Sequence, residues 1–547
     1  MTRRLAVTAA ALAPAVLAAQ EAGAPPPGTR FGVTARLVEI SVVAETVEGR
    51  PMPGLSQSDF TVFDEGDEQT LALFSVESSR MSRPAPRPAP ANTYTNRFEQ
   101  LGETPTAVTA VLFDGLNTRI EDQAFARDQI VRFLLGLQPG ERVAIYLMGR
   151  GPRVVQEFTS DPGSLLQALR EHRGSREPAL DAPLCDPALT PVSHFDAWFG
   201  ELSFQLIDYF DRDRAFRTVR AITAIARHLE RLPGRKNLVW VSGSFPVAID
   251  GGSIALPERV RRGLKAGWPE TDRLARALSR AGLAVYPVDA RGLLAPQNYR
   301  ADRAGVSADD SLRDAQMFGI MRTLAERTGG RAFYQNNDLA SAFRRAADDT
   351  RVTYLLGYYP SHDDWTGKFR RIRVATERSG VRLLHRAGYF ALPEEPRESW
   401  YREETLEAAM FSPLEASGIG LTAGVGQGEG GGLDLDLGID SRDITFEPSK
   451  GNWDCALDVW LIQMDRRERH LKTDARTTRL SLSQLDYQRV MQAGGLRLME
   501  RMKPASGALL VRVMVRDIAS GALGSVTVPL SVFATKPGTA TPGTSSR

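Results

Sequence analysis

Residues 106–118 read TAVTAVLFDGLNT, an apolar run that ends in small and polar residues. A run of this length is typical of a buried strand. Asp114, Asn117 and Thr118 follow at the point where the strand should end. A carboxylate, an amide and a hydroxyl in this place have two interpretations. Either the loop holds a cation through its oxygens, or the side chains bond exposed backbone groups after the strand.

The rest of the region 105–350 alternates between apolar strand runs and helical patterns. The strand runs are RVAIYLMG, RVVQEFT, KNLVWVSG and LAVYPVDA, and the most amphipathic helical pattern is AFRTVRAITAIARHLERL. This alternation predicts a doubly wound, mostly parallel α/β sheet of Rossmann-like type, covered by helices on both faces. Such sheets bind ligands beyond the carboxyl ends of their strands, which is where Asp114 lies.

Residues 31–79 and 351–392 have alternating apolar and polar positions, which predicts β-strands. Neither segment can bury a good β core alone, because an isolated hairpin is marginal in water. The ends of a compact domain often lie close together, so we expect both segments to share one sandwich into which the α/β domain is inserted. The side chains expected to meet there are Leu37, Phe63, Leu355, Ile372 and Leu383.

The remaining segments complete the predicted organisation. Residues 80–104 contain RPAPRPAPA, which predicts a Pro/Ala-rich linker. Residues 395–535 are rich in short strand patterns with glycine turns, which predicts a C-terminal β-sandwich. The tail 536–547 is expected to be disordered. An irregular insertion covers about 173–212, and its aromatic residues form either a local core or partner contacts.

The first residues, MTRRLAVTAAALAPAVLAAQ, have a short basic start, an Ala-rich apolar core and a small-residue cleavage site. This pattern predicts a signal peptide over residues 1–19. No later stretch reaches the ~20 apolar residues that a transmembrane helix needs. We therefore expect an exported protein, periplasmic or extracellular, with no transmembrane span after the signal is removed.

Charge and cysteine content exclude some classes of protein. The formal charge of +2 falls to zero when Arg3 and Arg4 leave with the signal peptide. A neutral chain argues against a nucleic-acid partner and against a polybasic membrane patch. The two cysteines, Cys185 and Cys455, lie far apart in the sequence, which favours separate thiols over a disulfide framework.

A set of ordered motifs resembles the bacterial VWFA-related family of exported proteins, which is built around a von Willebrand factor A domain. The motifs are VLFDGLNT, PGRKNLVWVSGSFP, VYPVDARGL, LAERTGGRAFYQNNDL, YLLGYYP, GKFRRIRV and RAGYF. The resemblance covers about residues 31–390. It implies an A-type fold, in which a metal-ion-dependent adhesion site commonly holds a divalent cation. In that site an Asp-x-Ser-x-Ser loop, a threonine from a second loop and an aspartate from a third provide the oxygens, and a partner's carboxylate fills the open position.

The adhesion-site pattern matches this sequence only in part. Asp114 matches the aspartate of the first loop, Thr118 its second serine, and Thr218 the threonine of the second loop. Leu116 stands where the first serine should be. Gly243 takes the place of the third-loop aspartate. The resemblance therefore implies a degenerate site with the ligands Asp114, Thr118 and Thr218, and either no cofactor or weak binding of Mg²⁺, Mn²⁺ or Ca²⁺.

Two more oxygen-bearing side chains lie at the same predicted edge. The amide of Asn117 offers a carbonyl oxygen, and Asp289 ends the strand LAVYPVDA. Neither restores the arrangement that the family pattern requires, because Mg²⁺ demands near-octahedral oxygen geometry.

Enzyme motifs are not evident in the sequence. Ser242 and Ser244 follow a buried strand, but Gly-x-Ser-x-Gly is missing around them. None of the six histidines stands in a metal-binding motif, and no glycine-rich phosphate loop follows the first strand. We therefore expect a non-enzymatic protein, with no catalytic residue.

The expected function is binding of an unknown protein ligand at the carboxyl edge of the sheet. The residues expected to line this surface are Asp114, Asn117, Thr118, Thr218, Ser242 and Ser244. Two alternatives stay open: a metal-free structural scaffold of the cell envelope, and an unrecognised hydrolase.

Overall fold

The structure is a computed structural model, and it describes residues 36–78, 82–83, 92–97, 104–105, 107–149, 151–171, 174, 213–246, 248–250, 253–255, 274, 277–293, 308–362, 364–391, 409–410, 412, 414–428 and 432–530. The predicted signal peptide, the C-terminal tail, Cys185 and nearly all of the insertion 173–212 lie outside these residues. Cys455 is a buried free thiol. Within the described residues, no helix combines the length and the apolar character that a membrane span requires.

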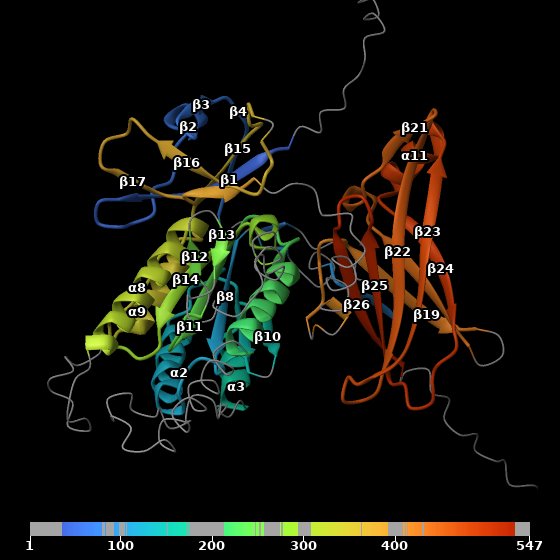
Figure 1. Ribbon diagram of the computed structural model, residues 1–547, viewed down its shortest axis with the longest axis horizontal. Coiled ribbons are helices and arrows are strands. Elements are labelled where there is room, and N and C mark those ends of the chain that lie inside the picture. Colours follow the sequence, from blue (N-terminus) through green and yellow to red (C-terminus); the bar gives the residue numbers. More distant parts are fainter. Residues whose placement is uncertain are drawn as a thin grey trace, which may run out of the picture. The chain divides into compact units, whose positions relative to one another are not determined.

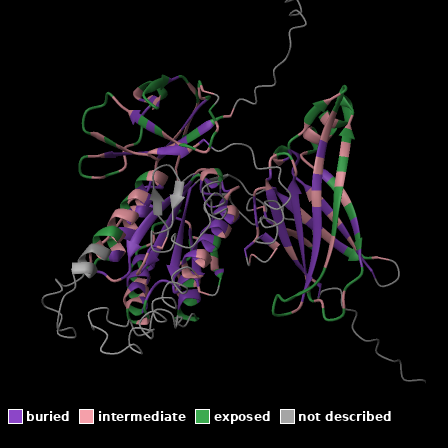
Figure 2. Cartoon of the chain, viewed as in Figure 1, coloured by how far each residue is buried: buried purple, intermediate pink, exposed green. Residues whose placement is uncertain are grey.

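A mostly parallel sheet is the centre of the α/β region (Figure 1). Its strand order is β10-β9-β8-β11-β14, and only the edge strand β10 runs antiparallel to its neighbour. The strands are β8 (Ala107–Asp114), β9 (Val143–Met148), β10 (Pro152–Thr159), β11 (Arg235–Ser242) and β14 (Leu283–Asp289). Every residue of the four parallel strands is buried (Figure 2), as expected for a sheet that is covered on both faces.

Helices pack against both faces of this sheet. One core joins the sheet to α2 (Ile120–Leu135), α3 (Pro162–Glu171) and α9 (Leu339–Asp348). The other core joins it to the helix over 213–229 and to α8 (Ala308–Thr328). The predicted combination of a mostly parallel α/β sheet with additional antiparallel β-sheets is confirmed.

An antiparallel β-sandwich, here called the N-terminal sandwich, combines strands from before and after the α/β region. One sheet has the order β17-β1-β15-β4, and the other β18-β16-β2-β3. The strands are β1 (Val38–Thr46), β2 (Thr61–Asp64), β3 (Asp67–Gln69), β4 (Leu71–Glu77), β15 (Thr353–Tyr358), β16 (Phe369–Ala375), β17 (Val381–Leu384) and β18 (Gly388–Phe390). One hydrophobic core contains residues of both segments, so the predicted sharing of a core is confirmed.

The residues predicted to meet in this core were only partly right. Ile372 is buried in it and Leu383 packs against it, but Leu37 is 37% exposed, and Phe63 and Leu355 are half-buried outside it. The core side of β1 is formed by Val38, Ile40, Val42 and Ala44. Successive side chains of a strand point to opposite faces, so choosing the neighbouring position reverses the face.

A buried carboxylate explains three of the sequence motifs. Asp64 accepts hydrogen bonds from the hydroxyls of Tyr358 at 2.9 Å and Tyr389 at 3.0 Å, and from Nε of Arg370 at 3.0 Å. These donors come from YLLGYYP, RAGYF and GKFRRIRV, respectively. The motifs thus share one structural task, which is to hold the two sheets of the sandwich around Asp64.

Ion pairs connect the N-terminal sandwich to the α/β region. Glu45 on β1 is buried and pairs with Arg331 at 2.9 Å and Arg345 at 3.3 Å. Arg331 also pairs with Asp349, at 3.0 Å. The sandwich is therefore attached to the α/β region by charged contacts as well as by the chain itself.

A second β module contains two sheets around one core, and it is called the C-terminal module below. One sheet has the order β24-β20-β19-β6, and the other β21-β22-β25-β26, with β23 also paired to β22. The strands are β6 (Thr93–Thr95), β19 (Leu421–Gln427), β20 (Leu433–Ile439), β21 (Glu447–Ser449), β22 (Asn452–Met464), β23 (His470–Leu482), β24 (Leu496–Met502), β25 (Leu510–Asp517) and β26 (Leu523–Pro529), and the helix α11 covers Gln484–Ala493.

The strand β6 lies within the segment predicted to be a linker. A strand of three residues gives no readable alternation in the sequence, which is why the pattern did not indicate it. The minor elements are β5 (Ser82–Arg83), which pairs with β7 (Thr104–Pro105), β12 (Ala248–Asp250), which pairs with β13 (Ser253–Ala255), and the 3₁₀ helices η1 (Gln57–Asp59) and η4 (Ser441–Asp443).

The shared core of the N-terminal sandwich can be tested with two leucines of its paired strands. Leu356 on β15 is fully buried, whereas Leu37, next to β1, is exposed. We expect Leu356→Ala to destabilise the sandwich by about 3 kcal/mol, because truncation leaves a cavity, and Leu37→Ala to cost under about 1 kcal/mol. Hydrogen exchange should then accelerate in the amides of β1 as well as β15 for Leu356→Ala. Unchanged protection of β1 would contradict a common core.

Candidate functional site

The carboxyl ends of β8 and β11 bring the predicted site residues together. The chain leaves β8 for β9 on one side of the sheet and returns later to β11 on the other side, so the order of connections reverses here. Asp114 ends β8 and Ser242 ends β11, and the Ser242 hydroxyl donates to Asp114 Oδ2 at 2.8 Å. The hydroxyl of Thr118 accepts from the Gly243 N–H at 2.9 Å. The crevice expected at this reversal is thus crossed by hydrogen bonds within the protein.

Asp114 is surrounded by five hydrogen-bond donors. Its Oδ1 accepts from the backbone N–H groups of Leu116 and Asn117, both at 3.0 Å. Its Oδ2 accepts from Asn117 Nδ2 at 2.9 Å, Trp240 Nε1 at 3.0 Å and Ser242 Oγ at 2.8 Å. A carboxylate offers about four lone-pair positions, so the protein's own donors occupy the acceptor capacity of Asp114.

The protonation equilibrium of Asp114 reflects this burial. Desolvation raises the pKa of the carboxyl, and the hydrogen bonds from Asn117, Trp240 and Ser242 act in the opposite direction. A carboxyl with a raised pKa in the folded state disfavours folding when it is ionised. This cost in folding free energy is absent at pH values below the pKa of the carboxyl in the unfolded chain. It is complete at pH values above the pKa of the same carboxyl in the folded chain. The five donors limit the cost without removing it.

The hydrogen bonds continue from Asp114 to Thr218, the predicted second-loop threonine, which lies in the helix over 213–229. Asn117 Nδ2 also donates to the hydroxyl of Thr218 at 2.9 Å, and that hydroxyl donates to the carbonyl of Arg214 at 2.8 Å. Asn117 Oδ1 is the exception, since it is buried and has no hydrogen-bond partner among the described residues. The structure therefore places Asn117 and Thr218 in the same network as Asp114, as the sequence predicted.

The side chains expected to line a binding surface are mostly buried. Asp114, Thr218 and Ser242 are 0% exposed, Asn117 is 2% and Thr118 1%, whereas Ser244 is partly exposed. Their polar groups bond one another and the neighbouring backbone. This is the second of the two interpretations of the loop, in which polar side chains bond the backbone after a strand.

The two positions that depart from the family pattern lie in closely packed surroundings. Leu116 is fully buried in the hydrophobic core on one face of the sheet. A Cβ at Gly243 would lie 3.1 Å from the carbonyl oxygen of Asn117 and 3.4 Å from Cα of Thr118. The loops after β8 and β11 approach each other so closely that a carboxylate at position 243 would push them apart.

Asp289 is also unavailable as a cation ligand. It is buried at the end of β14, and Arg291 binds both of its oxygens, with Nε at 3.0 Å and Nη2 at 2.9 Å. Arg291 also reaches Asp314 at 2.8 Å. With Asp114 saturated, Asp289 paired and position 243 filled by backbone, the residues of this edge do not fit a divalent cation. No group of three His, Cys, Asp or Glu side chains in the described part of the chain is arranged to hold a metal.

Two residues of this edge were not singled out from the sequence. Trp240 lies two residues before Ser242 on β11 and donates its indole N–H to Asp114. Arg291 lies two residues after Asp289 and pairs with it. A buried indole needs an acceptor for its N–H, so the tryptophan in VWVSGS is the signal from which a buried acceptor nearby could have been predicted.

The hydroxyl of Ser242 contacts Asp114 and Ser244 rather than a histidine in the described part of the chain. Its hydroxyl lies 2.8 Å from Asp114 Oδ2 and 2.7 Å from the carbonyl of Ser244, and it accepts from the Ser244 N–H at 3.3 Å. His228, on the helix over 213–229, instead contacts the carbonyl of Glu415 through Nδ1 at 2.9 Å. A serine nucleophile is activated by an adjacent general base, and the described contacts of Ser242 do not include an imidazole.

Comparison with known proteins gives matches to solved structures. No protein-family model and no curated protein sequence matches the chain. The solved structures that it resembles include the conserved hypothetical protein BatB from Bacteroides thetaiotaomicron, with 13% identity, 44% of this chain and 95% of that chain covered, and a TM-score of 0.20. The SpRpn10 VWA domain matches with 12% identity, 43% and 94% coverage, and a TM-score of 0.20.

A pilus adhesin matches over a larger part of the chain. SpaC from Lactobacillus rhamnosus GG, in its open conformation, has 9% identity, 83% of this chain and 60% of that chain covered, and a TM-score of 0.27. Scores this low carry no argument about activity or partners, and the description of the fold depends on the strand order and helices given above.

Proposed function

We propose that the protein is an exported, non-enzymatic protein-binding or adhesion protein whose α/β region is a doubly wound, Rossmann-like A domain that works without a metal ion. Antiparallel β-sandwiches flank this A domain in the proposal. The observation that carries it is the set of five donors around Asp114. They supply to the carboxylate what a cation supplies in a metal-dependent adhesion site, so the loop is ordered without an ion.

Metal independence follows from the chemistry of the donors. A divalent cation would have to displace neutral N–H and O–H groups from Asp114, and those groups would then be buried without acceptors. The Leu116 and Gly243 positions supply no oxygen in exchange. Binding of the partner in this proposal therefore does not pass through a shared cation, and it uses groups other than the buried Asp114 carboxylate.

A metal-free structural scaffold of the cell envelope is the second candidate. It is favoured by the burial of the residues that were expected to form the binding surface, because their polar groups are used internally. Under this alternative the A domain makes intramolecular contacts only, and it holds the two β modules. Export, to the periplasm or the outside of the cell, is supported by the sequence of the first twenty residues. The absence of enzymatic activity stays part of the proposal.

The role of Asp114 can be tested by replacing it with asparagine. Either orientation of the amide places its NH₂ group against at least two N–H donors, so we expect Asp114→Asn to destabilise the A domain by about 3 kcal/mol. Asp364→Asn, at an exposed loop position, should stay within about 0.5 kcal/mol of the parent. Urea unfolding gives the free energies, and hydrogen exchange of β8 and β11 assigns the loss to the A domain. An Asp114→Asn protein as stable as the parent would show that the five donors do not matter.

Calorimetric titration of the mature chain with Mg²⁺, Mn²⁺ and Ca²⁺ tests the proposed metal independence. We expect no saturable heat and no rise in melting temperature at millimolar cation, because tight binding to the folded state raises stability by mass action. Saturable binding that Asp114→Ala abolishes would overturn the proposal.

A variant that restores the family's ligands provides the matched experiment. Leu116→Ser with Gly243→Asp installs both missing oxygen donors, yet we expect no cation binding and a lower melting temperature. The serine leaves a cavity in the core, and the aspartate requires the two closely approaching loops to move apart. Strong Mg²⁺ binding by this double variant would show that the loops are more adaptable than their contacts indicate.

A further inference from the structure

The edge of β19 is paired with a segment that precedes the α/β region in the sequence, whereas β19 itself follows that region. Within β6, Thr93, Tyr94 and Thr95 pair antiparallel with Gly424, Ala423 and Thr422, respectively. Backbone bonds extend the pairing at both ends, from Val425 N to Asn92 O and from Asn96 N to Leu421 O, both at 3.3 Å. The C-terminal module therefore receives its edge strand from residues about 330 positions earlier in the sequence, as their register shows.

Asn96 fixes the register of this strand. Its side chain is buried, and Nδ2 donates to the carbonyls of Ala416 at 2.8 Å and Ile419 at 2.9 Å. Its Oδ1 accepts from the Leu421 N–H at 2.7 Å. Asparagine is the side chain of this length that donates twice and accepts once, so the module recognises the amide itself.

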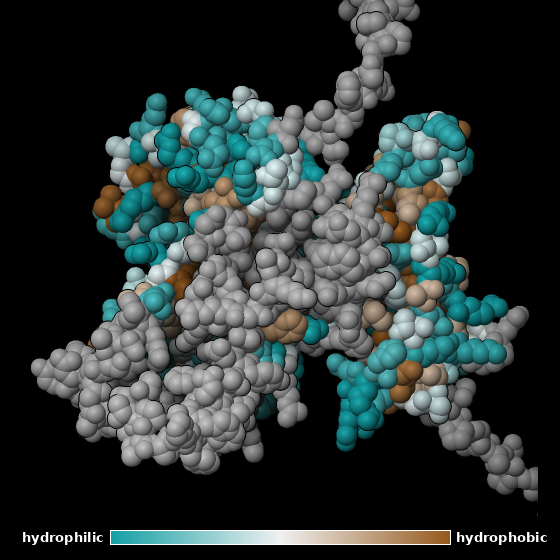
Figure 3. Space-filling model, in the orientation of Figure 1, coloured by the Kyte–Doolittle hydropathy of each residue, from teal (hydrophilic) through white to brown (hydrophobic). Residues whose placement is uncertain are grey.

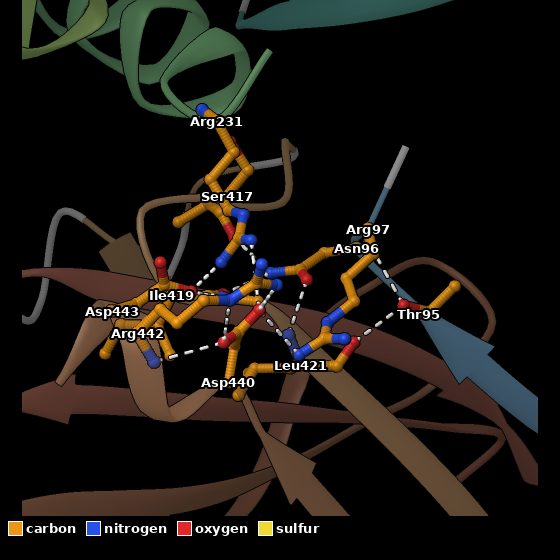
Figure 4. A network of polar contacts seen from close by, with 12 residues as sticks. Thr95, Asn96, Arg97, Arg231, Ser417, Ile419, Leu421, Asp440, Arg442 and Asp443 are labelled. Atoms are coloured by element: carbon orange, nitrogen blue, oxygen red, sulfur yellow. Dashed lines mark hydrogen bonds and ion pairs between the residues drawn. The ribbon is translucent and has the colours of Figure 1, made fainter. Parts of the chain in front are cut away.

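Arg97 enters a slot that ends at a buried carboxylate (Figure 4). Its Nη2 lies 2.9 Å from Oδ2 of Asp440, which is 0% exposed. The same oxygen is 3.3 Å from Arg231 and 2.7 Å from Arg442. A Cβ at Gly420 would lie 2.9 Å from Nε of Arg97 and 2.6 Å from Nη1 of Arg231, so a larger residue would require the guanidinium groups to shift.

We propose that the β19 edge is a strand-acceptor site that binds an extended peptide in which Asn-Arg follows the paired residues, and that residues 92–97 occupy it in cis. A partner segment of the same chemistry replaces them. This is recognition by strand addition, in which main-chain hydrogen bonds give affinity and side-chain pockets give specificity. The Asn96 contacts and the Asp440 slot are those pockets. The site lies in the C-terminal module and is independent of Asp114, so this proposal goes beyond the function proposed above.

The short pairing makes an exchange of strands feasible. Only three residues of β6 pair with β19, whereas β20 pairs with β19 along seven. Tethering within one chain compensates for such weak pairing, because the strand then binds in an intramolecular step. In the view of Figure 3, hydrophilic residues cover most of the described surface and hydrophobic residues gather in small groups.

A full-length variant with its own strand weakened tests the site. Tyr94→Pro removes a backbone donor from the strand, and Asn96→Ala with Arg97→Ala empties both pockets. The probe is the synthetic peptide ANTYTNRF, which copies residues 91–98, and the control peptide is ANTYTAAF. We expect the triple variant to bind the first peptide one to one and the control at least about tenfold more weakly. The parent protein should bind the first peptide about tenfold more weakly than the variant, because the tethered strand competes.

A benzophenone in place of the peptide's tyrosine locates the bound strand. Crosslinks to residues 421–425 support the proposal, and crosslinks elsewhere overturn it. Equal binding of both peptides by a folded variant, or binding of neither, overturns it as well. Asn96→Ala alone provides a milder variant if the triple variant does not fold. Arg501→Ala, on the opposite edge strand β24 of the same sheet, should behave like the parent. A dimer of the parent that the peptide dissociates would identify a second copy of the chain as the source of the strand.

Discussion

The antiparallel pairing of β1 with β15 is the constraint on which the architecture depends. Val38 lies opposite Tyr358 and Val42 opposite Tyr354, so the chain must return to its first strand after completing the α/β region. Each flanking segment contributes two strands to each of the two sheets, and β15 lies between β1 and β4, so the single core forms only when both segments are present. The ends of the α/β region are thereby held at a fixed separation. The ion pairs of Glu45 with Arg331 and Arg345 add a second attachment at the same junction.

Three buried aspartates hold segments that are distant in sequence, and each has a different set of donors. Asp114 has only neutral donors, and burial raises its pKa. Asp64 has two phenols and one guanidinium. For Asp440, burial opposes ionisation, but Arg442, Arg97 and Arg231 outweigh it and lower the pKa to about 2.

These surroundings give opposite dependences on pH. The stabilisation from Asp440 is present above the carboxyl's ordinary pKa and is lost as the pH falls towards 2. The cost of burying Asp114 instead grows as the pH rises through its raised pKa. A carboxylate can be buried at tolerable cost only when it is hydrogen-bonded or paired with a cation. The donors around each aspartate therefore determine how much it stabilises the contact between the segments that it connects.

The sequence predicted the features that have a period or a local signature. The parallel strands, their helices and the convergence of Asp114, Asn117, Thr118, Thr218 and Ser242 follow from alternating runs and from the position of polar residues after strands. The sharing of one sandwich core was also predicted, because the segments 31–79 and 351–392 are both short. Leu37, next to β1, was the wrong choice, because Glu39 and Ser41 share its face, whereas the uniformly apolar Val38, Ile40 and Val42 lie on the opposite face and are buried.

The contacts that were not predicted depend on distant partners. Nothing near Thr93–Thr95 indicates that β19 lies beside it, and nothing near Asp440 indicates Arg97. The saturation of Asp114 likewise needs Trp240 from another strand. Spacing along the chain thus gave the members of the site, whereas their burial and bonding required the three-dimensional arrangement.

The interleaved connectivity of the three parts also sets an order of events during folding. The N-terminal sandwich cannot close until β15–β18 have been synthesised, and the C-terminal module cannot take up β6 until β19 exists. Contacts between residues far apart in sequence form slowly, because loop closure costs entropy before the contact repays it. The α/β region has contacts between residues that are nearer in sequence, so it is the part that can form first. Its folding then brings the strands that precede and follow it in the sequence close to one another.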